Sequence, residues 1–489
     1  MQQKPLSFSV SSPPPFHQTS LRGSTSNAPA RTTPNPFAIP WEDYVSPSGD
    51  VRIISAAQDH RIFPTQLPSS IIAATFPSLA SDPLYRVIQL HMALHHKFVD
   101  VAHQKTDAFD TVELNWHEEA GPRLLPAHQC LHNLPRGTKW RMEHGAPKFL
   151  EIIIRCAFFI EPELMEVLLD HSTSRASLAV YMAKERVDFP LSQVFHLASP
   201  APLLPRHAQP PKFPTAPWVK HQERLSHSIV RPAPGSEAAA LRVGVACTKK
   251  YTWNNDDELW LMWMLDVVGV AHVVIDISTR DLELSKVENG LANHPGLAER
   301  VTLVDLDIPF GSPPITYCYL IESVARDVFM RWQADFDYIF MIDADEFVQL
   351  FDREPPFARL DVRTFIERNQ ERISREGLAY LRRPTILRSE ANNASDPMLG
   401  EFLATLPLLN GEELFSIIEP AARAPTADKM SVGKSLFWPP RAVYSFLHYN
   451  QDTPPVFYNV SEAHMLHVRQ EVKADSIRQY VDRMERWRS

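Results

Sequence analysis

The stretch Tyr338-Ile-Phe-Met-Ile-Asp-Ala-Asp-Glu-Phe347 joins five apolar residues to a pair of aspartates spaced two apart. An apolar run of this length, with β-branched and aromatic side chains, predicts a short buried strand. The chain is expected to bend where the strand ends, so that Asp343 and Asp345 face one pocket. Magnesium and manganese prefer oxygen ligands and often bind through one or two carboxylates together with substrate phosphates. The stretch therefore predicts a divalent-cation site at the end of a strand.

The residues that precede this stretch alternate between expected strands and expected helices. The strands are Leu241–Cys247, Ala271–Ile275 and Val301–Val304, and the helices are Glu258–Val268, which Asp256 and Asp257 can cap, and a second one that runs from Leu320 to Trp332. This alternation predicts an α/β fold with a mostly parallel, Rossmann-like sheet flanked by helices. Ligands of such sheets bind at the carboxyl ends of the strands, which is where the two aspartates are placed.

Several short motifs follow one another between residues 241 and 469. They are Val245-Ala-Cys-Thr248, Trp263, Gly269-Val-Ala-His-Val-Val-Ile275, Arg326-Asp327, Ile342-Asp-Ala-Asp-Glu-Phe347, Gly433-Lys-Ser435 with Pro439, His448 and His467-Val-Arg469. In order and spacing they resemble glycosyltransferase family 92. The resemblance implies a GT-A-type fold and a metal-dependent, inverting hexosyltransferase. Its donor would be a nucleotide sugar, in this family a UDP-sugar such as UDP-galactose, and its acceptor a glycan.

The resemblance also implies roles for individual residues. Asp343 and Asp345 would be the catalytic pair and would bind Mn²⁺ or Mg²⁺. His448 would be the third metal ligand, since it ends the apolar run Ala442–Leu447, and neutral imidazole suits manganese. The donor would be bound by the following side chains: Asp327, Lys434, His467 and Arg469. His467 is the alternative to His448 as the metal ligand.

The chain departs from the family pattern on the acceptor side. Val328 stands where the family usually has cysteine, and the expected aromatic-glycine motif is replaced in its region by Leu381-Arg-Arg-Pro384. The sequence therefore does not identify the acceptor. A carboxylate is expected to act as the general base, and four candidates remain open: Glu390, Glu401, Glu412 and Glu413.

Two other functions compete with an active transferase. Haloacid-dehalogenase-like phosphatases also place an aspartate pair after a strand, but they need it on the first strand of the domain, with Thr or Val where this chain has Phe347. A degenerate transferase that binds glycan or nucleotide without catalysis is the stronger alternative, because the acceptor motif is missing.

Composition divides the chain into four predicted parts. Residues 1–50 are rich in Pro, Ser, Thr and Asn, which predicts disorder. Residues 51–197 predict a β-rich accessory domain, 198–240 a Pro-rich linker, and 241–489 the catalytic domain. Within the accessory domain, Leu84–Val101 has a helical rhythm that places His91 and His95 one turn apart. This is a metal-ligand spacing, although a solvated helix face is the favoured interpretation.

Charge and cysteine content limit the partners and the compartment. The net charge of −9 disfavours nucleic acid as a partner, because phosphate neutralisation needs clustered Lys and Arg. The four cysteines form no C-x-x-C pair, so that a disulfide scaffold is not expected, although a single bridge stays open. Neither a transmembrane segment nor a signal peptide is visible. The Golgi or secretory pathway is expected from the family resemblance alone, and the oligomeric state is not predicted.

Overall fold

A computed structural model of the 489-residue chain describes most of two regions with separate hydrophobic cores. The described residues are 38–39, 44–58, 84–103, 105–118, 121–134, 148–169, 176–194, 213–249, 253–277, 284–294, 296–297, 299–305, 327, 332, 335–376, 378–382, 385–387, 406–414, 433–438, 456–458 and 462–469. The predicted disorder of the first 50 residues falls almost wholly outside them, apart from the strands β1 (Ala38–Ile39) and β2 (Tyr44–Val45).

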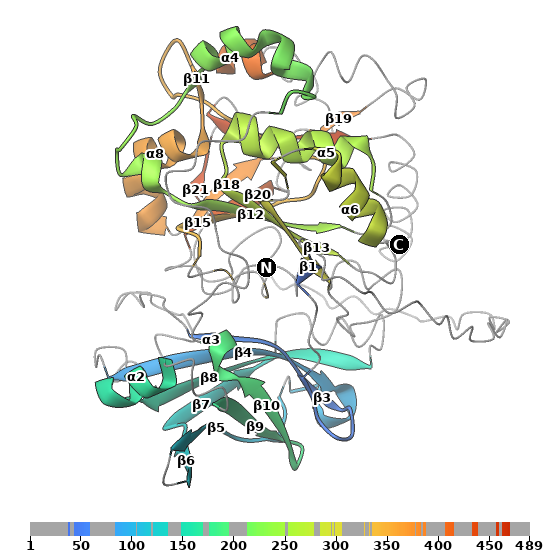
Figure 1. Ribbon diagram of the computed structural model, residues 1–489, viewed down its shortest axis with the longest axis vertical. Helices are drawn as coiled ribbons and strands as arrows, with labels where there is room; N and C mark the ends of the chain where they lie inside the picture. The colour runs from blue at the N-terminus through green and yellow to red at the C-terminus, as the bar shows by residue number, and fades with distance from the viewer. Residues whose placement is uncertain are drawn as a thin grey trace, which may run out of the picture. The chain divides into compact units, whose positions relative to one another are not determined.

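The first region consists of two antiparallel sheets that share one core, as Figure 1 shows. One sheet has the order β2-β3-β4-β8-β7 and the other β10-β9-β5-β6. The remaining strands are β3 (Val51–Gln58), β4 (Tyr85–His95), β5 (Phe109–Glu118), β6 (Gly121–Pro126), β7 (Gln129–Asn133), β8 (Phe149–Phe159), β9 (Ser177–Met182) and β10 (Glu185–Pro190). Two short helices, α2 (Pro162–Leu169) and α3 (Leu191–Val194), accompany them.

The helix expected over Leu84–Val101 is wrong, because residues 85–95 form the strand β4. Alternate residues from Ile88 to Leu94 are apolar, and all of these point into the shared core. The apolar residues of this segment fit both a helical period and a strand period of two, and the structure follows the strand period. His91 is consequently not on a solvated helix face: it is buried in a sheet, with its Nε2 2.6 Å from Oε1 of Glu151 on β8. The apolar runs Phe149–Phe159 and Leu178–Met182 predict buried strands, and the structure confirms both as β8 and β9.

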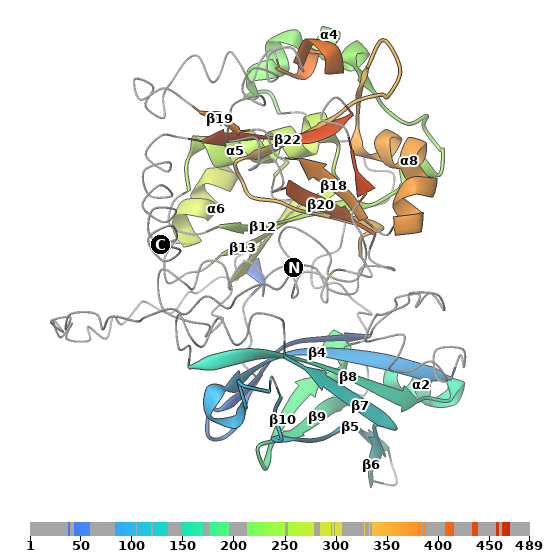
Figure 2. The ribbon, with the colours of Figure 1, turned by 180° about the vertical axis from the view of Figure 1, so that it is seen from behind.

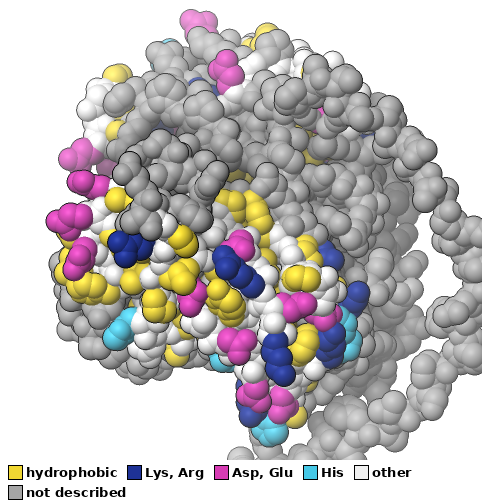
Figure 3. All heavy atoms as spheres, turned by 60° about the horizontal axis from the view of Figure 1, so that its bottom comes forward, with side chains coloured by type: hydrophobic (Ala, Val, Ile, Leu, Met, Phe, Trp, Pro, Cys, Tyr) yellow, Lys and Arg dark blue, Asp and Glu magenta, His cyan; other side chains and the backbone are white. Residues whose placement is uncertain are grey.

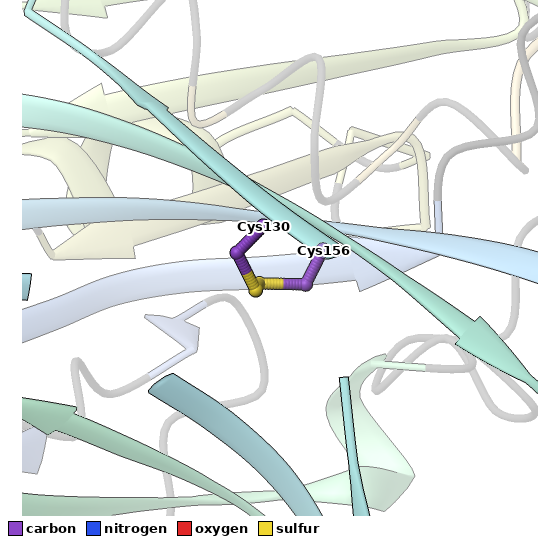
Figure 4. The surroundings of a disulfide bond; sticks show 2 residues. All are labelled: Cys130 and Cys156. Carbon is purple, nitrogen blue, oxygen red and sulfur yellow. A yellow bond between two sulfur atoms is a disulfide. The ribbon is translucent and has the colours of Figure 1, made fainter. Parts of the chain in front are cut away.

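A disulfide joins Cys130 on β7 to Cys156 on β8 (Figure 4). The two residues lie directly opposite each other in the antiparallel register, which brings their Cβ atoms within bonding reach. Cys156 is fully buried in the core between the sheets, so the bond ties this core to an outer strand. Figure 3 views the molecule from the side of the β10-β9-β5-β6 sheet, where acidic, basic and hydrophobic side chains are interspersed.

The second region is built on an 11-stranded sheet. Its main order is β1-β14-β13-β12-β15-β20-β18-β22-β16, with β19 and β21 at its side. The strands not yet bounded are β12 (Val243–Lys249), β13 (His272–Ile277), β14 (Val301–Asp305), β15 (Tyr338–Met341), β16 (Glu346–Leu350), β18 (Leu378–Arg382), β19 (Thr385–Leu387), β20 (Gly433–Phe437), β21 (Val456–Phe457) and β22 (Ala463–Arg469). A separate small sheet pairs β11 (Ile229–Val230) with β17 (Arg359–Leu360).

Helices flank this sheet in Figures 1 and 2. They are α4 (Gln222–Ser228), α5 (Asn255–Met262), α6 (Leu284–Ala292) and α8 (Val362–Glu376), with the π-helical turn η4 (Trp263–Val268) and the 3-10 turns η2 (Pro217–His221), η3 (Ala238–Ala240) and η5 (Leu406–Leu408). The N-cap of helix α5 is Asn254, whose side chain accepts the Asp256 N–H, and the predicted Asp257 completes a capping box by accepting the Asn254 N–H. The helix expected over residues 258–268 corresponds to most of α5 and the turn η4.

The predicted α/β class with a mostly parallel, Rossmann-like sheet is wrong for this chain. Strands exceed helices among the described residues, and both sheets of the first region are wholly antiparallel. In the large sheet, β20 runs antiparallel to both β15 and β18, and β16 runs antiparallel to β22. After β15, the strands β20 and β16 run in the opposite direction to it, whereas β18, β19, β21 and β22 run in the same direction. The half of the sheet that follows β15 is therefore of mixed direction.

Two further observations bear on the predicted organisation. Part of the predicted linker is ordered, because η2, α4 and β11 lie between residues 217 and 230, and Trp218 and Leu225 pack into the core of the second region. Among the described helices, none is both long and apolar enough to cross a bilayer.

His272 gives the large sheet a predicted sensitivity to acid. Burial, reinforced by the positive charge of Arg300, lowers the pKa of His272 to about 4. The unfolded chain takes up this proton near pH 6.5, whereas the folded protein resists it, so stability is lost as the pH falls from about 6.5 to about 4. We expect a loss of about 3 kcal/mol across this window. Urea unfolding at several pH values should show this slope flattened in His272→Gln and unchanged in His227→Gln, whose side chain is exposed.

Candidate functional site

The candidate site begins where β15 ends, with both predicted aspartates on the turn that joins β15 to β16. The four residues of β15 are fully buried, because the strand lies between β12 and β20. The side chains of Asp343 and Asp345 each keep 23% exposure. The turn thus delivers two carboxylates from a buried strand to the surface.

Lys434 reaches this turn from the antiparallel neighbour of β15. Met341 pairs with Ser435, so Lys434 lies across from the residue that precedes Asp343. The Lys434 Nζ atom donates to Asp343 Oδ2 at 2.9 Å, and it lies 3.8 Å from Glu346 Oε2. The side chain of Lys434 is 0% exposed. A buried ammonium is tolerated only where opposite charges and hydrogen bonds replace its lost water, and these two carboxylates provide them.

His467 approaches the other aspartate from β22. Strand β22 pairs with β16 so that His467 lies directly opposite Glu346. The His467 Nε2 atom is 3.4 Å from Asp345 Oδ2, and the imidazole is almost completely buried. The structure therefore brings three of the predicted site residues, besides Lys434, to one turn: both aspartates and His467.

Glu346 is the part of the site that sequence reasoning passed over. Its buried carboxylate accepts the backbone N–H of Asp343 at 2.9 Å, and it shares Lys434 with that residue. Its carbonyl oxygen accepts the indole N–H of Trp260 on α5, also at 2.9 Å. Glu346 thus holds the backbone of the aspartate turn in place from the buried side of the turn. The signal in the sequence is its position directly after the aspartate pair, within the motif Ile342–Phe347.

A second buried ion pair lies at the end of the neighbouring strand β12. The Lys249 ammonium contacts the carboxylate of Asp257, which also caps α5 by accepting the backbone N–H of Asn254. Burial raises the pKa of the Cys247 thiol well above its usual range, and the negative charge of Asp343 adds to this effect. Cys247 is therefore a neutral thiol buried in the core of this region. The pairing of β12 with β15 explains why the two ion pairs are neighbours.

The other predicted residues are not brought to the turn by any described contact. Asp327 is 0% exposed, so it is not a solvated surface residue. Arg469 ends β22, but its side chain is outside the described part of the chain. His448, with the strand expected before it, also falls outside the described residues.

The structure describes two of the four candidate bases. Glu390 and Glu401 fall outside the described residues. Glu412 is exposed on the short helix 411–414, and Glu413 accepts the Asn410 N–H at the start of that helix.

The donor atoms at the turn can be compared with the needs of a metal ion. Two carboxylates and an imidazole are suitable for Mn²⁺, and an ion that also binds a diphosphate needs only one or two protein carboxylates. Within the described ranges, no three His, Cys, Asp or Glu side chains are gathered closely enough to hold an ion by themselves. Lys434 and His467 instead face the two carboxylates. The residues fit a cation that arrives with its phosphate ligands.

Comparison with known proteins adds no assignment: neither a protein-family model nor a curated protein sequence matches this chain.

Proposed function

We propose that this protein is a metal-dependent glycosyltransferase that uses a nucleotide-sugar donor, in the manner of the family-92 enzymes its motifs resemble. The observation that carries the proposal is the convergence of Asp343, Asp345, Lys434 and His467 on one turn. These residues are up to 124 positions apart in the chain, since 467 − 343 = 124. The three motifs singled out by the resemblance thus lie together, which a solvated turn after a strand would not require.

The charges at the turn suit a nucleotide diphosphate and a divalent cation. Asp343 and Asp345 would hold Mn²⁺ or Mg²⁺, and the contact of His467 with Asp345 supports His467, rather than His448, as the third ligand. A cation bound there would neutralise the charge that develops on the departing diphosphate. Lys434 would offer the same diphosphate a point charge with three rotatable donors. The whole Lys434 side chain is buried, so its ammonium would act on the diphosphate from its position beside Asp343.

Glu346 and Trp260 would act by positioning. The Glu346 carboxylate accepts the backbone N–H of Asp343 and so holds the backbone of the turn where the Asp343 side chain meets Lys434. The indole of Trp260 fixes the backbone of Glu346 to α5. A preorganised turn loses less entropy when it orders around a donor. The acceptor would be a glycan, and no base for its hydroxyl group is assigned.

The compartment that we propose is the secretory pathway. Disulfides persist in oxidising compartments and are rare in the cytosol. The Cys130–Cys156 bond between buried neighbouring strands supports this location independently of the family resemblance.

A non-catalytic binding protein is the second candidate, and one contact favours it. Lys434 already neutralises Asp343, so the turn can be stable without a metal. In that case the turn would bind a glycan or nucleotide and release no sugar.

Thermal unfolding of the full chain with a panel of UDP-sugars tests the proposed site. A ligand that binds only the native state at 100 times its Kd stabilises it by about 2.7 kcal/mol, which corresponds to a rise of several degrees in Tm. We expect this rise for at least one UDP-sugar with Mn²⁺, and its loss when EDTA is added. A panel in which no donor shifts Tm, with or without the metal, would count against both candidates as nucleotide-binding proteins.

A further inference from the structure

A cavity of about 390 Å³ lies at the opposite end of β16 from the aspartate turn. It is open to solvent and falls in the lower range of small-molecule sites. Strand β16 has five residues, so the cavity and the turn are separated by about 17 Å of extended chain. None of the residues that line the cavity belongs to the candidate transferase site. It is therefore a separate feature that the proposed reaction does not use.

One wall of the cavity is a face of α8, which lies beside β18 and β21 (Figure 1). Phe365, Arg368, Asn369 and Arg372 follow the spacing i, i+3, i+4 and i+7, which places them on one side of a helix. The Phe365 ring is buried at the base, while the three polar side chains stand above it. The wall combines an apolar floor with hydrogen-bonding groups at the rim.

The facing wall supplies carboxylates that hold the arginines in place. Asp352, just after β16, is paired with Arg368. Glu462, whose side chain is only 11% exposed, lies 3.5 Å from Arg353 Nε and 3.7 Å from Arg372 Nη1. The Arg372 guanidinium also stacks over the ring of Tyr458, 4.2 Å from its centroid. These contacts fix the positions of donors and acceptors before any ligand arrives.

The charges of the lining exclude a strongly anionic ligand. Three arginines are matched by four acids, namely Asp352, Glu354, Glu371 and Glu462, so the net charge is 3 − 4 = −1. A phosphate or nucleotide would meet guanidinium groups that already have carboxylate partners. Eight of the 11 lining residues are charged or carry an amide, and this disfavours an apolar ligand as well.

We propose that this cavity binds a neutral oligosaccharide. A sugar hydroxyl both donates and accepts, so neighbouring hydroxyls can use a guanidinium fork and a carboxylate side by side. Phe351, Leu360 and Phe365 line the floor but are almost completely buried, so the contacts with the sugar come mainly from the polar side chains of the walls. This binding requires neither the nucleotide nor the cation, and it goes beyond the proposed transfer reaction.

The experiment is ligand-observed NMR on the full chain in EDTA, without nucleotide. The probes are two neutral oligosaccharides, chitotriose and lacto-N-neotetraose, and one anionic oligosaccharide, 3′-sialyllactose. We expect saturable binding of at least one neutral probe. Arg353→Ala removes a guanidinium from the rim, where its side chain is 83% exposed, and should weaken this binding by about tenfold. The matched control Arg224→Ala changes an exposed arginine on α4 and should leave the affinity unchanged.

Three outcomes overturn the proposal. They are the absence of binding by either neutral probe, equal affinity in the Arg353→Ala variant and the wild type, and preferential binding of the sialylated probe. EDTA removes metal-dependent donor binding, and the Arg353→Ala variant separates the cavity from the acceptor side of the transferase site, because Arg353 lines only the cavity. If the protein binds the neutral probe but shows no Mn²⁺-dependent response to UDP-sugars, the proposed oligosaccharide site is supported and the proposed transferase function is refuted.

Discussion

Replacement of Asp345 by alanine should lower kcat/KM for sugar transfer by about 10³-fold or more while leaving the fold intact. The variant removes one of two carboxylates at the aspartate turn, so a cation there loses a charged ligand and the diphosphate loses its counter-charge. Asp345 is partly exposed, and its described ion pair is with His467. We therefore expect a change of less than about 1 kcal/mol in the free energy of unfolding. Transfer rates and urea unfolding of the same preparations measure the two effects.

The control for this variant is Asp107→Ala, which removes an exposed carboxylate in the first region. It should alter neither rate nor stability. Full activity of Asp345→Ala with saturating Mn²⁺ would refute the assignment of the aspartate pair. A loss of rate accompanied by a loss of folding would mean that Asp345 has a structural role.

Replacement of Lys434 by methionine should destabilise the protein by about 3–5 kcal/mol. The substitution keeps an unbranched side chain of similar length but removes the buried ammonium. Glu346, which is 0% exposed, then remains as a buried carboxylate without this positive partner. Urea unfolding at neutral pH measures the change.

A double variant separates lost charge balance from lost packing. Lys434→Met combined with Glu346→Gln removes both buried charges, while the glutamine oxygen can still accept the Asp343 N–H. It should recover most of the stability lost in the single variant. Lys286→Met, at an exposed position on α6, is the control and should have almost no effect. If the single variant is as stable as the wild type, Lys434 is not the buried counter-ion that its contacts indicate.

Local pattern predicted the strands around the candidate site better than it predicted the fold. The expected strands at 241–247, 271–275, 301–304 and 338–342 correspond to β12, β13, β14 and β15, with ends that differ by a few residues. These strands are apolar because each is covered on both faces, and this makes them visible in the sequence. Strand direction is set by partners far along the chain, such as β20 against β15, and no local pattern encodes it.

The error at β4 has a different cause. Its residues satisfy both helical and strand periodicity, and the sequence window alone does not show that β3 and β8 are available to pair on either side. Pairing with β3 and β8 determines the conformation of these residues, because strand propensity depends strongly on tertiary context. His91, which the helical prediction places on the surface, is therefore a buried partner of Glu151.

At the candidate site, residue types were easier to predict than contacts. The aspartate pair was visible because it interrupts an apolar strand. The contacts of Lys434 with Asp343 and of His467 with Asp345 depend on the registers of β20 and β22. These strands lie far along the chain from the aspartates, and Lys434 is already 91 residues from Asp343. The supporting role of Glu346 could not be inferred, since it arises from a bond back to the turn itself.

The most direct test of the proposed transferase is the Mn²⁺-dependent release of UDP from a UDP-sugar by the purified full chain. Many transferases hydrolyse their donor slowly, so this assay avoids the unknown acceptor, and the donor can be chosen from the stabilisation panel. We predict that UDP release requires Mn²⁺ or Mg²⁺, stops with EDTA and is absent in Asp345→Ala. UDP release at the same rate in Asp345→Ala, or a wild-type protein that binds the donor with Mn²⁺ and never releases UDP, would contradict the proposed catalytic function.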